Sequence, residues 1–327
     1  MDGLRSLIDL ALELPVVPSF SRIGFAVRRR LFDWPDAESW SMTGRTVVIT
    51  GATSGLGRQA AASFARMGAR LVLVGRDADR LARTRVELLA EDAGAVDSVV
   101  ADMSSLDSVR AAADEVLALA PRIDVIVDNA GAMYPTRQMS PDGIEMSLAT
   151  MVVGPFVLVG RLWPRLAASP DGRLVAVTSG GMYAQRLPLD DLAYERGDYQ
   201  GARAYARAKR AQVALVREWA RRLRGRGVVA NAMHPGWADT PGLEASLPGF
   251  RSSMGSLLRS PAEGADTILW LAAAPEAKAA SGRVYLDRRI RPFDRVPATR
   301  LSAADRRDLW DQVVALSGEP DPTAPGR

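Results

Sequence analysis

Tyr205 and Lys209 stand four residues apart in the segment Tyr-Ala-Arg-Ala-Lys, and their types could do acid–base chemistry. In a helix this spacing places both side chains on one face. A phenol has a pKa of about 10, and a neighbouring ammonium group favours the phenolate and lowers that pKa. The pair could therefore exchange a proton with a substrate oxygen. Taken alone, the same pair is also common on helices that do no chemistry.

A glycine-rich segment follows a valine-rich stretch and precedes a helical pattern. Glycines let the backbone turn sharply and approach a pyrophosphate, and the N–H groups at a helix N-terminus favour negative charge. Gly55, Gly57 and Ala60 have the spacing of a dinucleotide-binding fingerprint. The sequence therefore predicts a dinucleotide cradle made by Gly51, Thr53, Ser54, Gly55, Leu56 and Gly57.

The position about 20 residues beyond the first glycine of the fingerprint indicates which dinucleotide is bound. NAD-binding proteins usually carry a carboxylate there, which accepts a hydrogen bond from the ribose 2′-hydroxyl. This chain has Gly75 followed by Arg76, and a guanidinium group can bind a 2′-phosphate through two hydrogen bonds. We therefore predict NADP(H), with NAD(H) as the less favoured cofactor. The alternative is that Arg76 is a solvated turn residue and that Asp77 reaches the ribose.

Short apolar runs alternate with helical segments along most of the chain, and these elements must position the residues above. Runs that are apolar on both faces are typical of buried parallel strands. Their alternation with helices predicts an α/β fold, a doubly wound parallel sheet of the Rossmann type in three αβα layers. The expected strands are Thr46–Thr50, Leu71–Val74, Ser98–Ala101, Val125–Val127, Leu174–Thr178, Val228–Ala232 and Val284–Leu286.

The chain divides into three expected parts. Residues 1–42 form an N-terminal extension, 43–290 form the NADP-binding Rossmann domain with its substrate site, and 291–327 form a C-terminal extension. The stretch from Glu319 to Arg327 is rich in proline and glycine, which predicts a frayed tail. The long polar segment between Gly180 and Ala202 predicts a substrate-binding wall or lid, or else a solvated surface.

The composition excludes several classes of function. Hydrophobic residues make up 47% and charged residues 24% of the 327 residues, as in an ordinary globular protein. The chain has no cysteine and a single histidine, His234, which excludes thiolate chemistry and multi-histidine metal sites; no metal is expected. Its net charge of +4 comes from basic residues scattered among acidic ones, which argues against nucleic-acid binding. We expect a cytoplasmic protein.

The N-terminal extension is apolar from Leu4 to Val17 and reaches a basic run at Arg28–Arg30. A secretory signal has the opposite order, with its charges before the apolar run. Asp9 and Glu13 interrupt the run, which favours a helix packed on the surface of the domain. The alternative is an interfacial helix through which residues 4–30 contact a membrane.

Further motifs occur in order along the chain, and together they resemble the short-chain dehydrogenase/reductase superfamily over roughly residues 43–286. Besides the glycine loop and Tyr-x-x-x-Lys, they are Asp128-Asn129-Ala130-Gly131, Thr178-Ser179 and Pro235-Gly236 followed by Thr240. More narrowly, residues 179–182 and 234–242 resemble the dehydrogenase/reductase member 12 group, near the retinol-dehydrogenase-like enzymes. The resemblance implies an oxidoreductase that transfers a hydride between NADP(H) and an apolar carbonyl or alcohol.

The resemblance also implies a role for each matching residue. Tyr205 would be the acid in ketone reduction and the base in alcohol oxidation, and Ser179 would hydrogen-bond the substrate oxygen. Lys209 would hold the nicotinamide ribose and lower the pKa of Tyr205. The other cofactor contacts would come from Asp102, Met103, Asn129, Ala130, Gly131, Pro235, Gly236 and Thr240. Family members commonly pair through the helices after Pro141 and around Tyr205, so a homo-oligomer is expected by analogy.

Two positions depart from the family pattern. Asp128 stands where the family usually has asparagine, and it can accept the same local hydrogen bonds. Met151 stands where the family carries an asparagine whose main-chain carbonyl is thought to bind a water linked to the lysine. Methionine offers that carbonyl but no side-chain hydrogen bonds. A second hypothesis follows, in which the protein binds NADP(H) as a sensor or scaffold with little catalysis.

Overall fold

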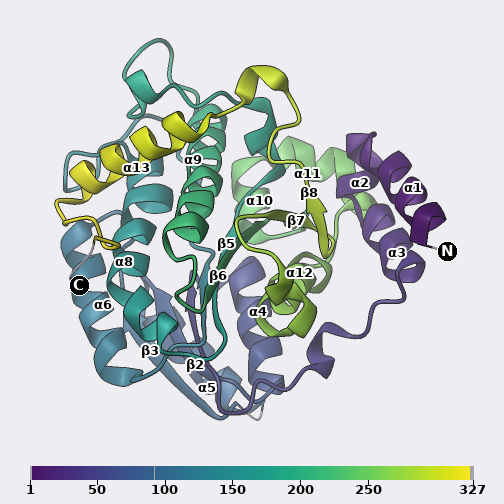
Figure 1. Ribbon diagram of the computed structural model, residues 1–327, viewed down its shortest axis with the longest axis horizontal. Coiled ribbons are helices and arrows are strands. Elements are labelled where there is room, and N and C mark those ends of the chain that lie inside the picture. The colour runs from purple at the N-terminus through teal and green to yellow at the C-terminus, as the bar shows by residue number, and fades with distance from the viewer. Residues whose placement is uncertain (1, 92, 325–327) are drawn as a thin grey trace.

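The protein forms an eight-stranded sheet with helices on both faces, in a computed structural model that describes residues 2–91 and 93–324 (Figure 1). The strands lie in the order β3-β2-β1-β4-β5-β6-β7-β8, and all neighbours are parallel except β7 and β8. The strands are β1 (Thr46–Thr50), β2 (Arg70–Gly75), β3 (Ala95–Val100), β4 (Val125–Asp128), β5 (Gly172–Val177), β6 (Val228–Met233), β7 (Val284–Leu286) and β8 (Arg289–Arg291).

Two helical layers enclose the sheet, which confirms the three-layer α/β prediction. Side chains of α4, α5 and α12 join the core on one face, and those of α6, α8, α9 and α13 join it on the other. The α-helices are α1 (Asp2–Glu13), α2 (Val16–Phe20), α3 (Arg22–Leu31), α4 (Gly55–Arg66), α5 (Ala78–Leu89), α6 (Leu106–Leu119), α7 (Met146–Leu148), α8 (Gly154–Ala167), α9 (Gly201–Arg222), α10 (Pro241–Ser246), α11 (Pro248–Met254), α12 (Pro261–Ala273) and α13 (Ala303–Ser317). Single 3₁₀ turns cover Ala37–Ser39, Gly180–Ala184, Leu189–Asp191, Gly255–Leu257, Pro275–Ala279 and Pro297–Thr299, and Ala149–Val153 is a π-helix.

The valine-rich runs become the parallel strands because both of their faces are buried. Every residue of β1, β4 and β5 is buried, which is the pattern expected of central strands between two helical layers. Thr46–Thr50 and Val284–Leu286 have the predicted bounds, and the other predicted strands overlap the observed ones with ends shifted by a few residues.

The edge strand β8 was absent from the sequence prediction. It pairs with β7 through a tight turn at Asp287 and Arg288, both of which have φ of +55°. Such hairpin turns usually carry glycine or asparagine, so this one gave no local signal. Ion pairs hold both side chains instead: Asp287 binds Arg28 and Arg259, and Arg288 binds Asp266.

The N-terminal helices α1, α2 and α3 pack beside this turn through a buried ionic cluster. Arg28 is fully buried and donates to Asp9, Glu13 and Asp287, each at 2.7 Å. Arg291 of β8 donates to Asp9 as well, at 2.9 Å. The acidic residues that interrupt the apolar run therefore attach the extension to the sheet edge.

The C-terminal segment is more ordered than predicted. Helix α13 lies against α8 and α9, and Trp310 is fully buried there against Phe156 and Trp219. The tail beyond it does not fray as expected over residues 319–324: Glu319 pairs with Arg110 and Arg161 at 2.9 Å. Its proline and glycine content suggested disorder, but Asp321 pairs with Arg222 and the carbonyl oxygen of Pro322 accepts the N–H of Trp163. The last three residues of the predicted tail lie outside the described part.

One helical run, Met146–Ala167, has the length and hydropathy of a membrane span. The run consists of α7, the π-helix and α8, and 83% of its most apolar window is buried inside the protein. It therefore packs as an interior helix of the Rossmann domain.

Candidate active site

The predicted dinucleotide cradle forms where β1 ends and α4 begins. Gly51 and Gly55 have φ of +67° and +52°, a region that L side chains rarely adopt. A Cβ at Gly57 would lie 2.3 Å from the carbonyl oxygen of Gly51, so no side chain fits there. The backbone is thus free to approach a pyrophosphate, and the first N–H groups of α4 point out of its N-terminus. This geometry fits a dinucleotide.

Asn129 ties the turn after β4 to this cradle. Its side-chain nitrogen Nδ2 donates to the carbonyl oxygen of Thr50 at 2.9 Å, and the main-chain N–H groups of Asn129 and Ala130 donate to the Thr50 hydroxyl. Gly131 follows, close to the side chains of Met151 and Lys209. The segment Asn129–Gly131 therefore lies between the cradle and the predicted catalytic lysine.

Arg76 is exposed directly after β2, beside the cradle. Asp77 is engaged elsewhere, because its Oδ1 accepts the main-chain N–H of Arg80 at 2.9 Å and caps α5. Arg58, a second basic residue of the loop, pairs with Glu87 at 2.7 Å. Among the described residues Arg76 has no hydrogen-bond partner, whereas the Asp77 carboxylate already caps α5.

The other predicted cofactor residues lie at the same carboxyl edge of the sheet. Asp102 follows β3 and accepts hydrogen bonds from Ser104, and Met103 is buried next to it. Gly236 follows β6 with φ of +70°, and Thr240 caps α10 by accepting the N–H of Leu243 at 3.2 Å. A Cβ at Gly55 would lie 3.3 Å from Thr240, so the loop after β6 contacts the cradle.

The predicted catalytic residues converge on the same edge. Ser179 follows β5, and Tyr205 and Lys209 lie on the first turns of α9. Burial raises the pKa of Tyr205, and a hydrogen bond with Ser179 lowers it. The two hydroxyl groups are therefore neighbours, as acid–base work on one substrate oxygen requires.

Lys209 is buried and anchored by the chain. Its Nζ donates to the carbonyl oxygen of Val177 at 2.8 Å and to Oε1 of Gln212 at 3.3 Å, and it lies 5.9 Å from the centre of the Tyr205 ring. Burial lowers the pKa of Lys209 to about 8, and the charge of Asp128 counteracts this effect. The pKa of Tyr205 stays above its ordinary value because burial outweighs the hydrogen bond with Ser179, and Lys209 does not contribute the lowering that the resemblance implies.

Met151 lies at the wide turn of the π-helix Ala149–Val153 and is fully buried. A Cβ placed at Gly131 would lie 3.2 Å from Sδ of Met151 and 3.4 Å from Nζ of Lys209. Pro155 has no N–H, so the main-chain carbonyl of Met151 lacks its usual α-helical donor four residues on. The wide turn therefore forms without asparagine, and the Met151 side chain and Nζ of Lys209 both lie against Gly131.

His234 has no catalytic role in this arrangement. It is fully buried at the end of β6, and its ring packs against Phe20 and Tyr183. Burial, followed by the charge of Arg259, lowers its pKa to about 3, so the imidazole is neutral at physiological pH. In the described part of the chain, no group of three or more His, Asp or Glu side chains is arranged to hold a metal.

Phe20 is a site residue that the sequence analysis missed. Its ring would lie 2.4 Å from a Cβ at Gly180, the residue after Ser179, and its carbonyl oxygen accepts the N–H of Trp237 at 2.8 Å. Trp237 in turn packs on Phe250, with ring centres 5.0 Å apart. Phe20, Trp237 and Phe250 thus form an aromatic wall, of which Phe20 is the buried end. Met182 and Leu187, which lie in the segment expected to form a substrate-binding wall, are buried in the core as Phe20 is.

Comparison with known proteins agrees with this geometry. The family model described as short chain dehydrogenase matches residues 45–248. The chain belongs to this family. It is similar to dehydrogenase/reductase SDR family member 12 of Bos taurus, with 38% identity over 83% of this chain and 84% of that protein. Retinol dehydrogenase 14 of Homo sapiens is 34% identical over 85% of this chain and 87% of that protein.

Two solved structures that are similar to this chain contain the kind of cofactor that the cradle fits. RhlG of Pseudomonas aeruginosa, in complex with NADP, has a TM-score of 0.62 and 25% identity over 75% of this chain and 94% of that one. The 3-ketoacyl-(acyl-carrier-protein) reductase of Brucella melitensis, in complex with NADH, has a TM-score of 0.61 and 26% identity over 75% and 96%. The Rossmann-fold chain is therefore an oxidoreductase of a family that uses nicotinamide cofactors.

Proposed function

We propose that this short-chain dehydrogenase/reductase transfers a hydride between NADP(H) and an apolar carbonyl or alcohol. The observation that carries the proposal is the convergence of Ser179, Tyr205 and Lys209 beside the glycine cradle. In that cradle a side chain at Gly57 would clash with the main chain of Gly51. A nicotinamide cofactor supplies or accepts the hydride. The same convergence disfavours a sensor or scaffold, because Lys209 stays anchored to Val177 beside Tyr205 although Met151 stands in the asparagine position.

The chain's own residues orient the substrate and move its proton. The Ser179 and Tyr205 hydroxyls would both hydrogen-bond the substrate oxygen, and Tyr205 would give its proton to that oxygen during reduction or take it during oxidation. The Lys209 ammonium group would supply positive charge behind the phenol and hold the ribose end of the cofactor. Phe20, Trp237 and Phe250 would exclude water on the substrate side.

Replacing Tyr205 with phenylalanine tests the assignment directly. Tyr205→Phe removes the proton donor but no part of the cradle, so kcat should fall by about 100-fold or more while the Kd for NADPH stays unchanged. Steady-state NADPH oxidation with a panel of aldehydes, ketones and quinones gives kcat, and fluorescence titration gives Kd. Tyr285→Phe, which removes a phenol hydroxyl from β7 near Trp270, is the matched control and should keep full activity. Turnover by wild type no faster than by Tyr205→Phe would instead select the sensor or scaffold.

Preference for NADP(H) rests on Arg76. Arg76→Asp should lower the ratio of kcat/KM for NADPH to that for NADH by about tenfold or more, because a carboxylate repels a 2′-phosphate and accepts from a 2′-hydroxyl. Arg83→Asp, an exposed residue on α5, makes the same charge change away from the cradle and should leave the ratio unchanged. Equal ratios in wild type and Arg76→Asp would assign the ribose contact to another residue.

We also propose that the protein is cytoplasmic and rests on a membrane through α1 and α2. Helix α1 and the link to α2 leave apolar side chains exposed, among them Leu7 at 65% and Leu14 at 78%. The exposed Arg29 and Arg30 of α3 suit anionic lipids. Sedimentation with anionic phosphatidylserine vesicles should carry down wild type but not Leu7→Glu/Leu14→Glu. Equal sedimentation of both proteins, or of neither, would contradict this contact.

A further inference from the structure

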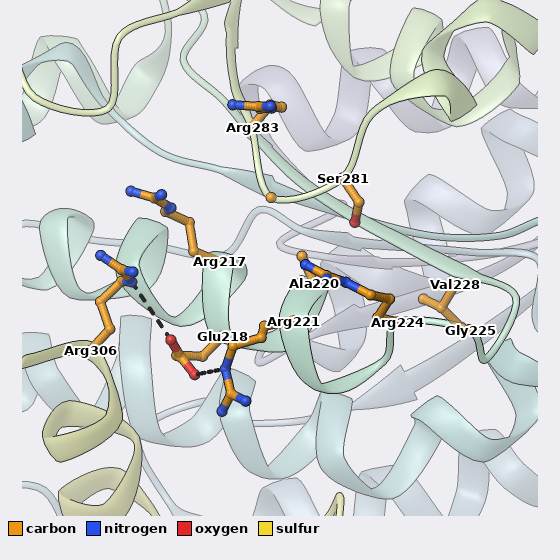
Figure 2. Close-up of a pocket in the computed structure, with 11 residues that line it drawn as sticks. Arg217, Glu218, Ala220, Arg221, Arg224, Gly225, Val228, Ser281, Arg283 and Arg306 are labelled. Carbon is orange, nitrogen blue, oxygen red and sulfur yellow. Dashed lines mark hydrogen bonds and ion pairs between the residues drawn. The ribbon is translucent and has the colours of Figure 1, made fainter. Parts of the chain in front are cut away.

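A pocket of about 520 Å³ is lined by the residues that Figure 2 draws as sticks. It is formed by the last turns of α9, the start of β6 and the loop before β7. Tyr205 lies 16 residues before Arg221 on α9, which places the two about 24 Å apart along the helix axis at 1.5 Å per residue. The start of β6 also lies at the amino edge of the sheet, opposite the carboxyl edge where the predicted cofactor residues lie. The pocket is therefore separate from the active site.

The lining of this pocket is strongly basic. Its charged side chains are those of Arg217, Arg221, Arg224, Arg283, Arg306 and a single carboxylate, Glu218. Five arginines against one glutamate leave an excess of four positive charges, as large as the net charge of +4 of the whole chain. Ordinary protein surfaces alternate charges of both signs, so such an excess in one hollow favours an anionic ligand.

Glu218 neutralises only part of this charge. Its Oε2 accepts from Nε of Arg221 at 2.8 Å, and its Oε1 lies 3.6 Å from Nε of Arg306. Among the residues that the structure describes, no carboxylate oxygen lies within 4.0 Å of Arg217, Arg224 or Arg283. Three guanidinium groups at the pocket therefore keep their N–H donors for a ligand or for water.

Several of these side chains are held in place. The Arg217 guanidinium lies 4.6 Å from the centre of the Phe293 ring, and Arg306 donates to the carbonyl oxygen of Leu301 at 2.9 Å. Burial, followed by the charge of Arg306, lowers the pKa of Arg217. The helix dipole favours arginine at the C-terminus of α9, but Arg283 and Arg306 come from other elements. Their convergence on the same hollow is not explained by the helix.

We propose that this arginine-lined pocket binds a small anion with two or more adjacent phosphate groups. Planar guanidinium groups bind phosphate oxygens through paired hydrogen bonds, and several such groups suit several phosphates. The volume lies within the range of small-ligand pockets, roughly 300–1,000 Å³. The phosphates can belong to a free oligophosphate or to a nucleoside diphosphate, which share this chemistry.

Calorimetric titration tests the proposal on the full chain. Saturating NADPH is present throughout, so that the cradle is occupied, and the probes are inorganic tripolyphosphate and ADP. Wild type should bind at least one probe with 1:1 stoichiometry. Arg217→Gln/Arg283→Gln should weaken that binding by about tenfold or more. The control Arg29→Gln/Arg30→Gln removes the same charge from exposed positions on α3 and should bind as wild type does.

Each outcome decides the proposal. Tight binding of tripolyphosphate alone assigns the pocket to free oligophosphates, and tight binding of ADP assigns it to nucleotides; either supports the site. Absence of saturable binding, or equal weakening in the two double variants, overturns it. Arg224→Gln alone, at an exposed side chain, gives a second variant that should also weaken binding if the double variant fails to fold.

Discussion

At the scale of single residues, the most unusual feature of the site is the buried carboxyl group of Asp128. Nε2 of Gln212 donates to its Oδ2 at 2.6 Å, and Gln212 also accepts from Lys209. Its Oδ1 has no hydrogen-bond partner among the described residues. Burial raises the pKa of Asp128, and the charge of Lys209 lowers it. Asp128 and Lys209 therefore influence each other's pKa, and the side chain of Gln212 hydrogen-bonds both of them.

Asp128→Asn should change the pH dependence of turnover. Asp128 holds the Lys209 pKa up against burial, so its removal lowers that pKa below its present value of about 8. If the ammonium form is the active one, activity is present below the Lys209 pKa and is lost as pH rises through it. The descending limb of kcat/KM should therefore move to lower pH by about one unit in the variant. Rate measurements between about pH 6 and 10 give this limb.

A matched control is Asp124→Asn, which neutralises another buried carboxylate at the opposite end of β4, where it accepts the N–H of Thr46. Its descending limb should coincide with that of wild type. A limb that stays in place in Asp128→Asn would show that Asp128 does not influence the lysine.

At the scale of elements, the N-terminal extension contacts the loops of the predicted active site. Helix α2 brings Phe20 against Gly180, and the buried Arg28 cluster fixes the extension to β8. The aromatic wall of Phe20, Trp237 and Phe250 therefore depends on a residue outside the Rossmann domain.

Phe20→Ala should remove this wall and raise KM for large apolar carbonyls by about tenfold, with a smaller effect on short aldehydes, because apolar contact area is lost. Phe25→Ala is the control: Phe25 is equally buried on α3, but it packs on Trp34. Both variants should lower Tm, since each removes a buried aromatic ring. An equal rise in KM in the two variants would show that lost stability, and not the wall, causes it.

Sequence reasoning located the elements of the Rossmann domain because its signals are local. Valine-rich strands, the glycine loop and the spacing of Tyr205 and Lys209 are read within a few residues, and the fold brings them to one sheet edge. Phe20 and strand β8 escaped prediction because their roles depend on distant partners. The Phe20 ring is defined by Gly180 and His234, and the Asp287 turn by Arg28.

At the scale of the whole molecule, helix α13 bears on oligomeric state. The expected homo-oligomer would pair through the helices around α8 and α9, but α13 lies on them and buries Trp310 between them. An apolar face that would need a partner subunit is therefore covered by the chain itself.

The protein should accordingly not pair through this face, and light scattering after size exclusion should give a molar mass near 35.1 kDa. Trp310→Ala should loosen α13, lower Tm and expose Phe156 and Trp219, which favours association at high concentration. A dimer of wild type that is disrupted by substitutions on α8 or α9 would contradict this prediction.

The contact between Gly180 and Phe20 also limits how the chain can be recombined. A chimera that joins the first 42 residues of a relative to this catalytic domain must carry, at position 20, a ring that fits against a bare glycine backbone. A methyl group at Gly180, or at Gly236, where a Cβ would lie 2.5 Å from the Phe20 carbonyl oxygen, would force the N-terminal helices away. The extension and the catalytic loops are therefore expected to be exchangeable only as a unit.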